Sequence, residues 1–286
     1  MNVSVTGPAS NAAIAASRLG TASAWLSKLP DDSLGRRVAG ELRRHGVEPA
    51  VCWGEGRQGL SFVERTAAPR DDGRIDDQAG AAVASLTPDD LPALDFQGAE
   101  TLFTSAATLA LSDTLAGTVE ELFAAFDGRT ALTLHRSRAL DSSVARERVE
   151  SMLSATDVLL ASEAGAAALG EDRSPPEAAH ALAAAHDLDT VVLADPGSGA
   201  LVWHERTVHE RDSPDAATID ERGAFDALCG GFLARRIASD GVDEALAAGV
   251  ACGALARTVQ GSIPVVTPDE VDDCIAAMDD DRDGRR

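Results

Sequence analysis

The sequence contains no tyrosine, a single lysine and no long apolar run. No segment approaches the roughly 20 apolar residues that cross a bilayer as a helix, so a membrane-spanning helix is excluded. The N-terminus also lacks an apolar run behind a basic stretch, which predicts no signal peptide and a cytoplasmic protein. The 286 residues are enough to bury a sizeable core.

Basic residues are scarce beside acidic ones. The chain has 25 Lys plus Arg against 47 Asp plus Glu, a net charge of −22, and every basic residue except Lys28 is arginine. This acidity argues against a nucleic-acid-binding protein. An acidic, lysine-poor surface is typical of a halophilic cytoplasmic protein, because at molar salt the Debye length is about 3 Å and surface carboxylates repel one another little. The charge then reflects the habitat and not a cationic partner.

Cysteine and histidine form no metal-binding motif. The four cysteines contain no CxxC pair and are predicted to be small thiols, three of them in helices, in a reducing compartment. The histidines form no HExxH motif, and we interpret His204 and His209 as surface residues of a hairpin. We therefore expect no metal-ligating side-chain cluster.

Apolar patterns and helix-ending signals divide the chain into alternating strands and helices. We expect strands at 22–29, 50–53, 59–64, 101–104, 130–135, 157–161, 190–194 and 199–203. We expect helices at 11–19, 33–44 (capped by Ser33), 112–126, 142–154, 175–186, 223–237, 242–259 and 268–278, and a charged, frayed tail at 279–286. Residues 65–75 are polar and predicted to be a loop or flap.

This alternation predicts βαβ units in a single α/β domain, 1–286, with a mostly parallel sheet. The sheet would be doubly wound, the middle layer of a three-layer sandwich. The segment from about 54 to 80 interrupts the alternation, and we predict that it forms a small lid.

A glycine-containing loop runs directly into a helix near residue 223. Gly223 and Ala224 precede Asp226, which falls in the first helical turn. Free N–H groups at a helix start can bind an anion, and an adjacent carboxylate can accept a proton from a hydroxyl that attacks a phosphoryl group. The alternative is that Asp226 only satisfies the helix start and that Gly230 and Gly231 allow close helix packing.

This stretch resembles the C-terminal signature of the ribokinase/pfkB carbohydrate kinases, D-T-x-G-A-G-D-x-F-x-x-G-F. The matching residues are Asp220, Gly223, Ala224, Asp226, Gly231 and Phe232. Gly7, Asn11 and the helix after them resemble the family's first signature, G-G-x-x-x-N-x-A. The similarity covers nearly the whole chain and looks closest to 2-keto-3-deoxygluconate kinases of halophilic archaea. It implies a ribokinase-like fold with a small, abbreviated β lid.

The resemblance also implies an activity. ATP, with Mg²⁺, would donate its γ-phosphoryl group to a primary hydroxyl of a sugar or sugar acid under the lid. Asp226 would be the catalytic base, and the backbone of Gly223, Ala224 and Phe225 the anion hole. The implied substrate-binding residues are Gly7, Asn11 and Arg136, and the implied nucleotide-binding residues are Asp220, Gly197, Gly199 and Gly261. Family members often dimerise through the lid, so a homodimer is possible here.

Several positions depart from the family pattern. The last glycine of G-A-G-D is Phe225, whose side chain adds bulk and resists a positive φ. The N-x-x-E motif, which organises Mg²⁺, aligns with Ser162 and Gly165, and the T-x-G nucleotide turn aligns with 194–196. At the lid positions where 2-keto-3-deoxygluconate kinases carry Tyr and Arg, the chain has Asp76 and Gln78, which disfavour a carboxylate ligand.

These observations leave three functions open: an active sugar or sugar-acid kinase, a catalytically impaired family member that binds or regulates, and a kinase for another acceptor such as a nucleoside or hexose phosphate. The absence of a basic cluster for a substrate phosphate weakens the third. Only Met1–Thr6 precede the first signature, so we expect either a true start upstream of Met1 or the loss of one core strand.

Overall fold

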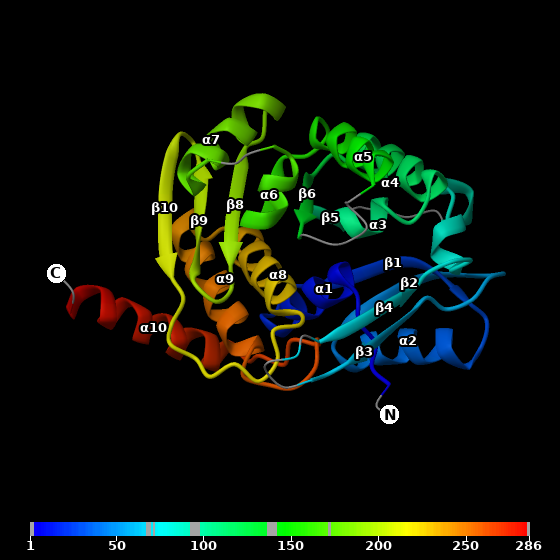
Figure 1. Cartoon of the computed structure of the whole chain (residues 1–286), viewed down its shortest axis with the longest axis horizontal. Coiled ribbons are helices and arrows are strands. Elements are labelled where there is room, and N and C mark those ends of the chain that lie inside the picture. The colour runs from blue at the N-terminus through cyan, green and yellow to red at the C-terminus, as the bar shows by residue number, and fades with distance from the viewer. Residues whose placement is uncertain are drawn as a thin grey trace.

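A six-stranded sheet forms the centre of the molecule (Figure 1). The computed structural model describes residues 3–66, 70, 72–91, 98–135, 142–170 and 173–284. Four parallel strands are β5 (Thr101–Ser105), β6 (Arg129–Leu134), β7 (Val158–Ser162) and β8 (Thr190–Asp195). The antiparallel β9 (Gly199–His204) and β10 (Thr207–Asp212) complete the order β10-β9-β8-β7-β6-β5. The predicted α/β fold with a mostly parallel sheet is confirmed.

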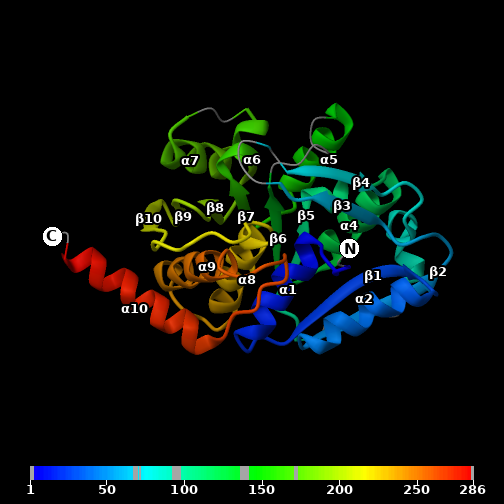
Figure 2. The same cartoon turned by 60° about the horizontal axis from the view of Figure 1, so that its bottom comes forward.

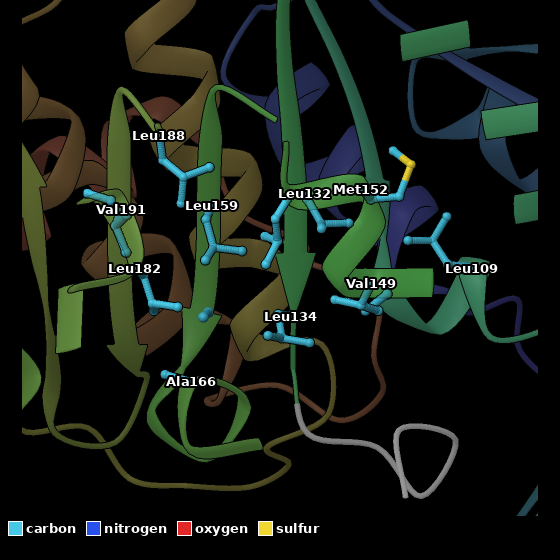
Figure 3. Close-up of a cluster of buried hydrophobic side chains, with 14 of the residues drawn as sticks. Leu109, Leu132, Leu134, Val149, Met152, Leu159, Ala166, Leu182, Leu188 and Val191 are labelled. Carbon is cyan, nitrogen blue, oxygen red and sulfur yellow. The ribbon is translucent and has the colours of Figure 1, made fainter. Parts of the chain in front are cut away.

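Alternating strand residues bury one face of the sheet against a first layer of helices (Figure 3). Leu132, Leu134 and Leu159 point into this layer and are at most 1% exposed. The helices that cover them are α3 (Ala106–Leu109), α4 (Asp113–Ala125), α5 (Ser143–Leu153), α6 (Glu163–Ala168) and α7 (Pro175–His186). Both faces of β6 and β7 are buried, because helices cover these strands on both sides.

The opposite face packs against helices from the C-terminal half. Val158, Leu160 and Val192 contact α8 (Ala224–Ile237) and α9 (Val242–Ala256). Helix α1 (Pro8–Arg18) lies against α8 at Gly230, where a Cβ would overlap the Ala12 carbonyl oxygen. The last helix, α10 (Pro268–Gly284), packs on α9 (Figure 1).

The N-terminal strands form separate small sheets among the described residues (Figure 2). Strand β1 (Ser23–Pro30) pairs in parallel with β2 (Val47–Gly54) through α2 (Ser33–Arg44). Strands β3 (Leu60–Glu64) and β4 (Gly73–Asp77) form an antiparallel hairpin in the predicted lid segment. The short 3-10 helices η1 (Ala82–Ser85) and η2 (Pro88–Asp90) lead back to β5.

Some local predictions were wrong. Asp32, not Ser33, caps α2, because its carboxylate accepts the N–H groups of Leu34 and Gly35 at 2.9 Å. The stretch 73–75 belongs to β4 and not to a loop, since its backbone pairs with β3. Helix α9 ends at Ala256, and α10 continues into the expected frayed tail as far as Gly284. The β9–β10 hairpin around His204 and His209 is confirmed.

Within the described residues, no helix is both long and apolar enough to cross a membrane.

Replacing Gly230 with alanine tests the close contact of α1 and α8. The new Cβ would lie 2.7 Å from the Ala15 Cβ and would also overlap backbone, so we expect the free energy of unfolding to fall by about 1–3 kcal/mol. Urea denaturation measures the change. The matched control is Gly40→Ala in α2, where a Cβ meets no atom within 4 Å and stability should rise by about 1 kcal/mol. Equal effects of the two changes would contradict the packing argument.

Candidate active site

The start of α8 presents backbone N–H groups next to a carboxylate. Gly223 is the N-cap with φ +78°, and a Cβ there would overlap the Ser262 carbonyl, so only glycine fits. The Ala224 N–H donates to Glu221 O at 3.2 Å and is therefore occupied. No described residue accepts the N–H groups of Gly223, Phe225 or Asp226. These three groups are oriented to bind an anion.

Asp226 lies beside these amides and is held from α1. The Asn11 Nδ2 donates to Asp226 Oδ2 at 2.8 Å. Asn11 is 2% exposed, and its Oδ1 has no hydrogen-bond partner among the described residues, so it is available to a ligand hydroxyl. The Gly7 carbonyl accepts the Asn11 N–H at 2.8 Å. Three of the predicted site residues, Gly7, Asn11 and Asp226, therefore meet at one place.

The environment makes Asp226 more basic than an ordinary aspartate. Burial raises the pKa of Asp226, and the Asn11 hydrogen bond and the charges of His135 and Arg74 only partly offset this effect. A carboxylate with a raised pKa is better matched to accepting a proton near neutral pH. The geometry thus combines a proton acceptor with an anion site.

Phe225 is turned into the core. It has an ordinary helical backbone, because the left-handed position of this turn is Gly223. Its side chain is 5% exposed, packs in the sheet-facing core and stacks on His135 with ring centroids 4.8 Å apart. The backbone strain that we expected at Phe225 is therefore absent.

Asp220 anchors the loop before α8 and is 3% exposed. Its carboxylate accepts Arg222 Nη2 at 2.6 Å, Arg65 Nη1 at 2.9 Å and the Gly261 N–H at 2.9 Å. Burial alone would raise the pKa of Asp220, but the hydrogen bonds from Arg222 and Gly261 outweigh it and lower the pKa to about 2. The predicted nucleotide-binding residues Asp220 and Gly261 are thus in direct contact.

The other two predicted nucleotide-binding glycines lie in the β8–β9 turn. The Gly197 N–H donates to Asp195 Oδ1 at 2.9 Å, and Gly199 has φ +137°. Arg257 joins this turn to the Asp220 loop: its Nη1 donates to Pro196 O at 2.8 Å, and its carbonyl accepts the Asp220 N–H at 3.2 Å. The four predicted positions therefore belong to three linked loops: the β8–β9 turn, the loop before α8 and the loop after α9.

The two residues that align with the family's N-x-x-E motif, Ser162 and Gly165, have structural roles here. Ser162 caps α6 by accepting the Gly165 N–H at 3.0 Å, and a Cβ on Gly165 would overlap the Leu134 carbonyl. Over the described ranges no three His, Cys, Asp or Glu side chains form a metal cluster. Mg²⁺ that is bound through nucleotide phosphates needs only one or two protein carboxylates, so the lack of a three-residue cluster in this part of the chain does not conflict with it.

The β3–β4 hairpin brings a cation toward Asp226 that we did not predict as a site residue. The Arg74 Nε donates to both Asp76 oxygens at 2.9 and 3.0 Å, and Ser61 Oγ also donates to Asp76. The charge of Arg74 also lowers the pKa of Asp226, so this guanidinium acts electrostatically on the site. The sequence signal that could have found Arg74 is its spacing from Asp76. It precedes Asp76 by two residues, which puts both side chains on the same face of the strand.

Two other residues escaped prediction for different reasons. Arg65 and Arg257 belong to no motif, and their contacts depend on the tertiary structure. The predicted substrate-binding residue Arg136 lies outside the described residues.

Comparison with known proteins decides the family. The pfkB family carbohydrate kinase pattern matches residues 1–269. The chain belongs to this family. A 2-dehydro-3-deoxygalactonokinase of Haloferax volcanii is 45% identical over 272 residues, covering 93% of this chain and 86% of the relative. A 2-dehydro-3-deoxygluconokinase of Thermoproteus tenax is 29% identical, covering 96% and 86% of the two chains.

Solved structures show the same fold. The 2-dehydro-3-deoxygluconokinase of Thermotoga maritima superposes with a TM-score of 0.89 at 20% identity, over 96% of this chain and 90% of that chain. A putative ribokinase II of E. coli in complex with ATP and Mg²⁺ gives a TM-score of 0.86 at 20% identity, over 95% and 89%. This pfkB-family chain therefore has the ribokinase-like α/β fold.

Removing the Asn11 amide tests how the Asp226 pKa is set. In Asn11→Ala the carboxylate loses a hydrogen bond that favours its charged form, so its pKa should rise further. Carbon-13 NMR titration of the Asp226 carboxyl measures the shift. Ser10→Ala, which removes a hydroxyl bonded to Gly7 O in the same turn, serves as control and should leave the titration unchanged. A fall in the pKa of Asp226 in Asn11→Ala would contradict this assignment.

Proposed function

We propose that this pfkB-family protein is an ATP-dependent kinase that phosphorylates a primary hydroxyl of a 2-keto-3-deoxy sugar acid. The observation that carries the proposal is the Asn11–Asp226 pair at the open start of α8. It combines a carboxylate of raised pKa with three N–H groups that no described residue occupies.

Each group has a role in this reaction. Asp226 accepts the proton of the attacking hydroxyl, and Asn11 keeps its carboxylate oriented toward that hydroxyl. The N–H groups of Gly223, Phe225 and Asp226 stabilise the negative charge of the transferring phosphoryl group. Mg²⁺, when bound with ATP, neutralises phosphate charge. The loops of Gly197 and Gly261 hold the nucleotide, and Gly7, Asn11 and Arg136 hold the acceptor.

The hairpin supports a sugar acid as the acceptor. The Arg74 guanidinium acts electrostatically on Asp226, and guanidinium groups pair well with carboxylates. Its ion pair with Asp76 cancels the carboxylate charge that we inferred to disfavour a sugar acid. The relatives from Haloferax and Thermoproteus act, by their names, on 2-dehydro-3-deoxy sugar acids.

A binding or regulatory protein is the second candidate. The observation that favours it is the conversion of the N-x-x-E position into the Ser162 cap of α6, which removes a carboxylate from the nucleotide side. Such a protein would bind ligands at the same site without turning them over.

Asp226→Asn separates the two candidates when assayed with ATP and Mg²⁺ at molar KCl. We expect the wild-type protein to phosphorylate 2-keto-3-deoxygluconate or 2-keto-3-deoxygalactonate. The substitution should lower kcat by about 10²–10⁴-fold because it removes the proton acceptor but keeps the shape. Nucleotide binding by calorimetry, unchanged in the variant, is the control. Wild-type binding without turnover of either acid would favour the regulatory protein, and full activity of the variant would refute the assigned base.

Arg74→Gln tests the acceptor class. Loss of the guanidinium should raise KM for the sugar acid by about 10- to 100-fold, the cost of a hydrogen bond to a charged group. A neutral sugar such as fructose has no carboxylate and should show little change in KM, which makes it the matched comparison. Equal increases for both substrates would show that Arg74 does not read the carboxylate.

A further inference from the structure

His135 directly follows β6 and lies against the first turn of α8. Leu134 points into the first helix layer (Figure 3), so the residues on either side of it face α8 instead. The Thr133 hydroxyl accordingly contacts Cys229 Sγ at 3.6 Å. One step further along the strand, the His135 ring stacks on Phe225 with centroids 4.8 Å apart. The register of β6 therefore places an imidazole at the end of the sheet where α8 begins.

The His135 ring is held by its face, and its nitrogens are free. The planes of the His135 and Phe225 rings lie 26° apart, so the contact is a stack. Neither Nδ1 nor Nε2 has a hydrogen-bond or ion-pair partner among the residues that the structure describes. His135 is exposed, so a ligand can reach these atoms. The ring is thus oriented without using its polar atoms.

Phe225 connects this imidazole to the anion site. Its backbone supplies one of the three N–H groups at the start of α8 that no described residue occupies. Its side chain is the ring on which His135 stacks. An anion held by these N–H groups is therefore separated from the imidazole by the side chain of a single residue.

His135 is also a basic group that no carboxylate neutralises. Among the described residues, the basic side chains whose charges act on Asp226 are His135 and Arg74. Arg74 donates to both carboxylate oxygens of Asp76 and is already paired. His135 forms no such ion pair in the described part of the chain, so its charge is available to an anionic ligand.

The charge of His135 depends on what occupies the site. The titratable groups around the ring are Asp226 and Cys229 of α8 and Asp195 at the end of β8. Partial burial lowers the pKa of His135, and the charges of the two aspartates only partly offset it, so the free ring is mostly neutral at pH 7. Burial raises the pKa of the Cys229 thiol, which therefore stays neutral. Phosphate oxygens near the ring would favour its charged form.

We propose that His135 takes up a proton from solvent when the donor phosphates bind at the start of α8, and that the imidazolium then binds a phosphoryl oxygen. The inference rests on the kinase function proposed above and adds a residue to its site. Phosphate oxygens beside Asp226 raise the pKa of this carboxyl and favour its protonation, whereas a neighbouring imidazolium lowers it. The proton on His135 therefore keeps the base ionised, and it returns to solvent when the nucleotide leaves.

NMR of the imidazole tests the protonation directly. The Cε1–H signal of His135, assigned by its loss in His135→Phe, is titrated in molar KCl with and without a non-hydrolysable ATP analogue saturated with Mg²⁺. We expect the pKa of His135 to rise when the analogue binds. A pKa that stays the same or falls in the complex overturns the proposal.

Calorimetry counts the protons taken up per nucleotide. Binding enthalpies at pH 7 are compared in two non-phosphate buffers of different ionisation enthalpy. We expect uptake of up to one proton by the wild-type protein and almost none by His135→Phe, which keeps the stack, or His135→Gln, which keeps a hydrogen-bond donor. His180→Phe is the matched control and should retain the uptake, because His180 also lies beside an aromatic ring, that of Trp203, but belongs to α7. Uptake that persists in His135→Phe and is lost in Asp226→Asn would assign the proton to the aspartate and overturn the proposal.

The pH dependence of turnover separates phosphate binding from packing. In His135→Phe, kcat at pH 7 should fall about tenfold, the effect of losing a hydrogen bond to a charged group. The acid limb of the kcat profile should also move to higher pH, because Asp226 loses a neighbouring cation. An equal loss at every pH would show that the ring only packs.

The outcomes also separate this role from the kinase function. Proton uptake at His135 without phosphoryl transfer to any sugar acid refutes the kinase function and leaves the role of His135 supported. Phosphoryl transfer without proton uptake at His135 does the reverse.

Discussion

The hydrogen bond between Asn11 and Asp226 is the interaction on which the site depends. It joins residues 215 positions apart, one in the first helix and one in the eighth. The two helices can approach closely because Gly230 has no side chain to hold them apart. Their glycine N-caps, Gly7 and Gly223, put a carbonyl and free amides at the starts of these two helices. The proposed proton acceptor, anion site and acceptor-binding residues thus all depend on one helix pair.

Much of the fold could be predicted because its signals are local. Strands such as β7 are apolar on both faces, and helices such as α7 begin at a proline and end before a left-handed residue. Strand β4 escaped prediction because most of its residues are exposed and polar, so its sequence resembles a loop and only its pairing with β3 defines it. The acidic end of α10 reads as a solvated tail for the same reason.

The site was predictable where it follows a contiguous motif. Gly223 and Asp226 belong to one, and their positions in the structure agree with the geometry that the motif suggests. Arg65 could not be predicted, since its partner Asp220 lies 155 residues away and no spacing rule connects them. Phe225 was expected to disturb the turn. Its side chain instead faces the sheet, because the orientation of α8 directs that helical position toward His135.

Three arginines act on Asp220 and Asp226 before and at the start of α8, in contrast to a chain whose net charge is −22: Arg65, Arg74 and Arg222. An anionic nucleotide or acid that approaches from bulk water meets repulsion from the whole body before it reaches these few cations. Added salt shortens the range of that repulsion to a few ångströms but weakens direct contacts with these cations much less. For the anionic ligands proposed above, encounter should therefore speed up as ionic strength rises, the reverse of the behaviour of enzymes that steer their ligands by long-range attraction.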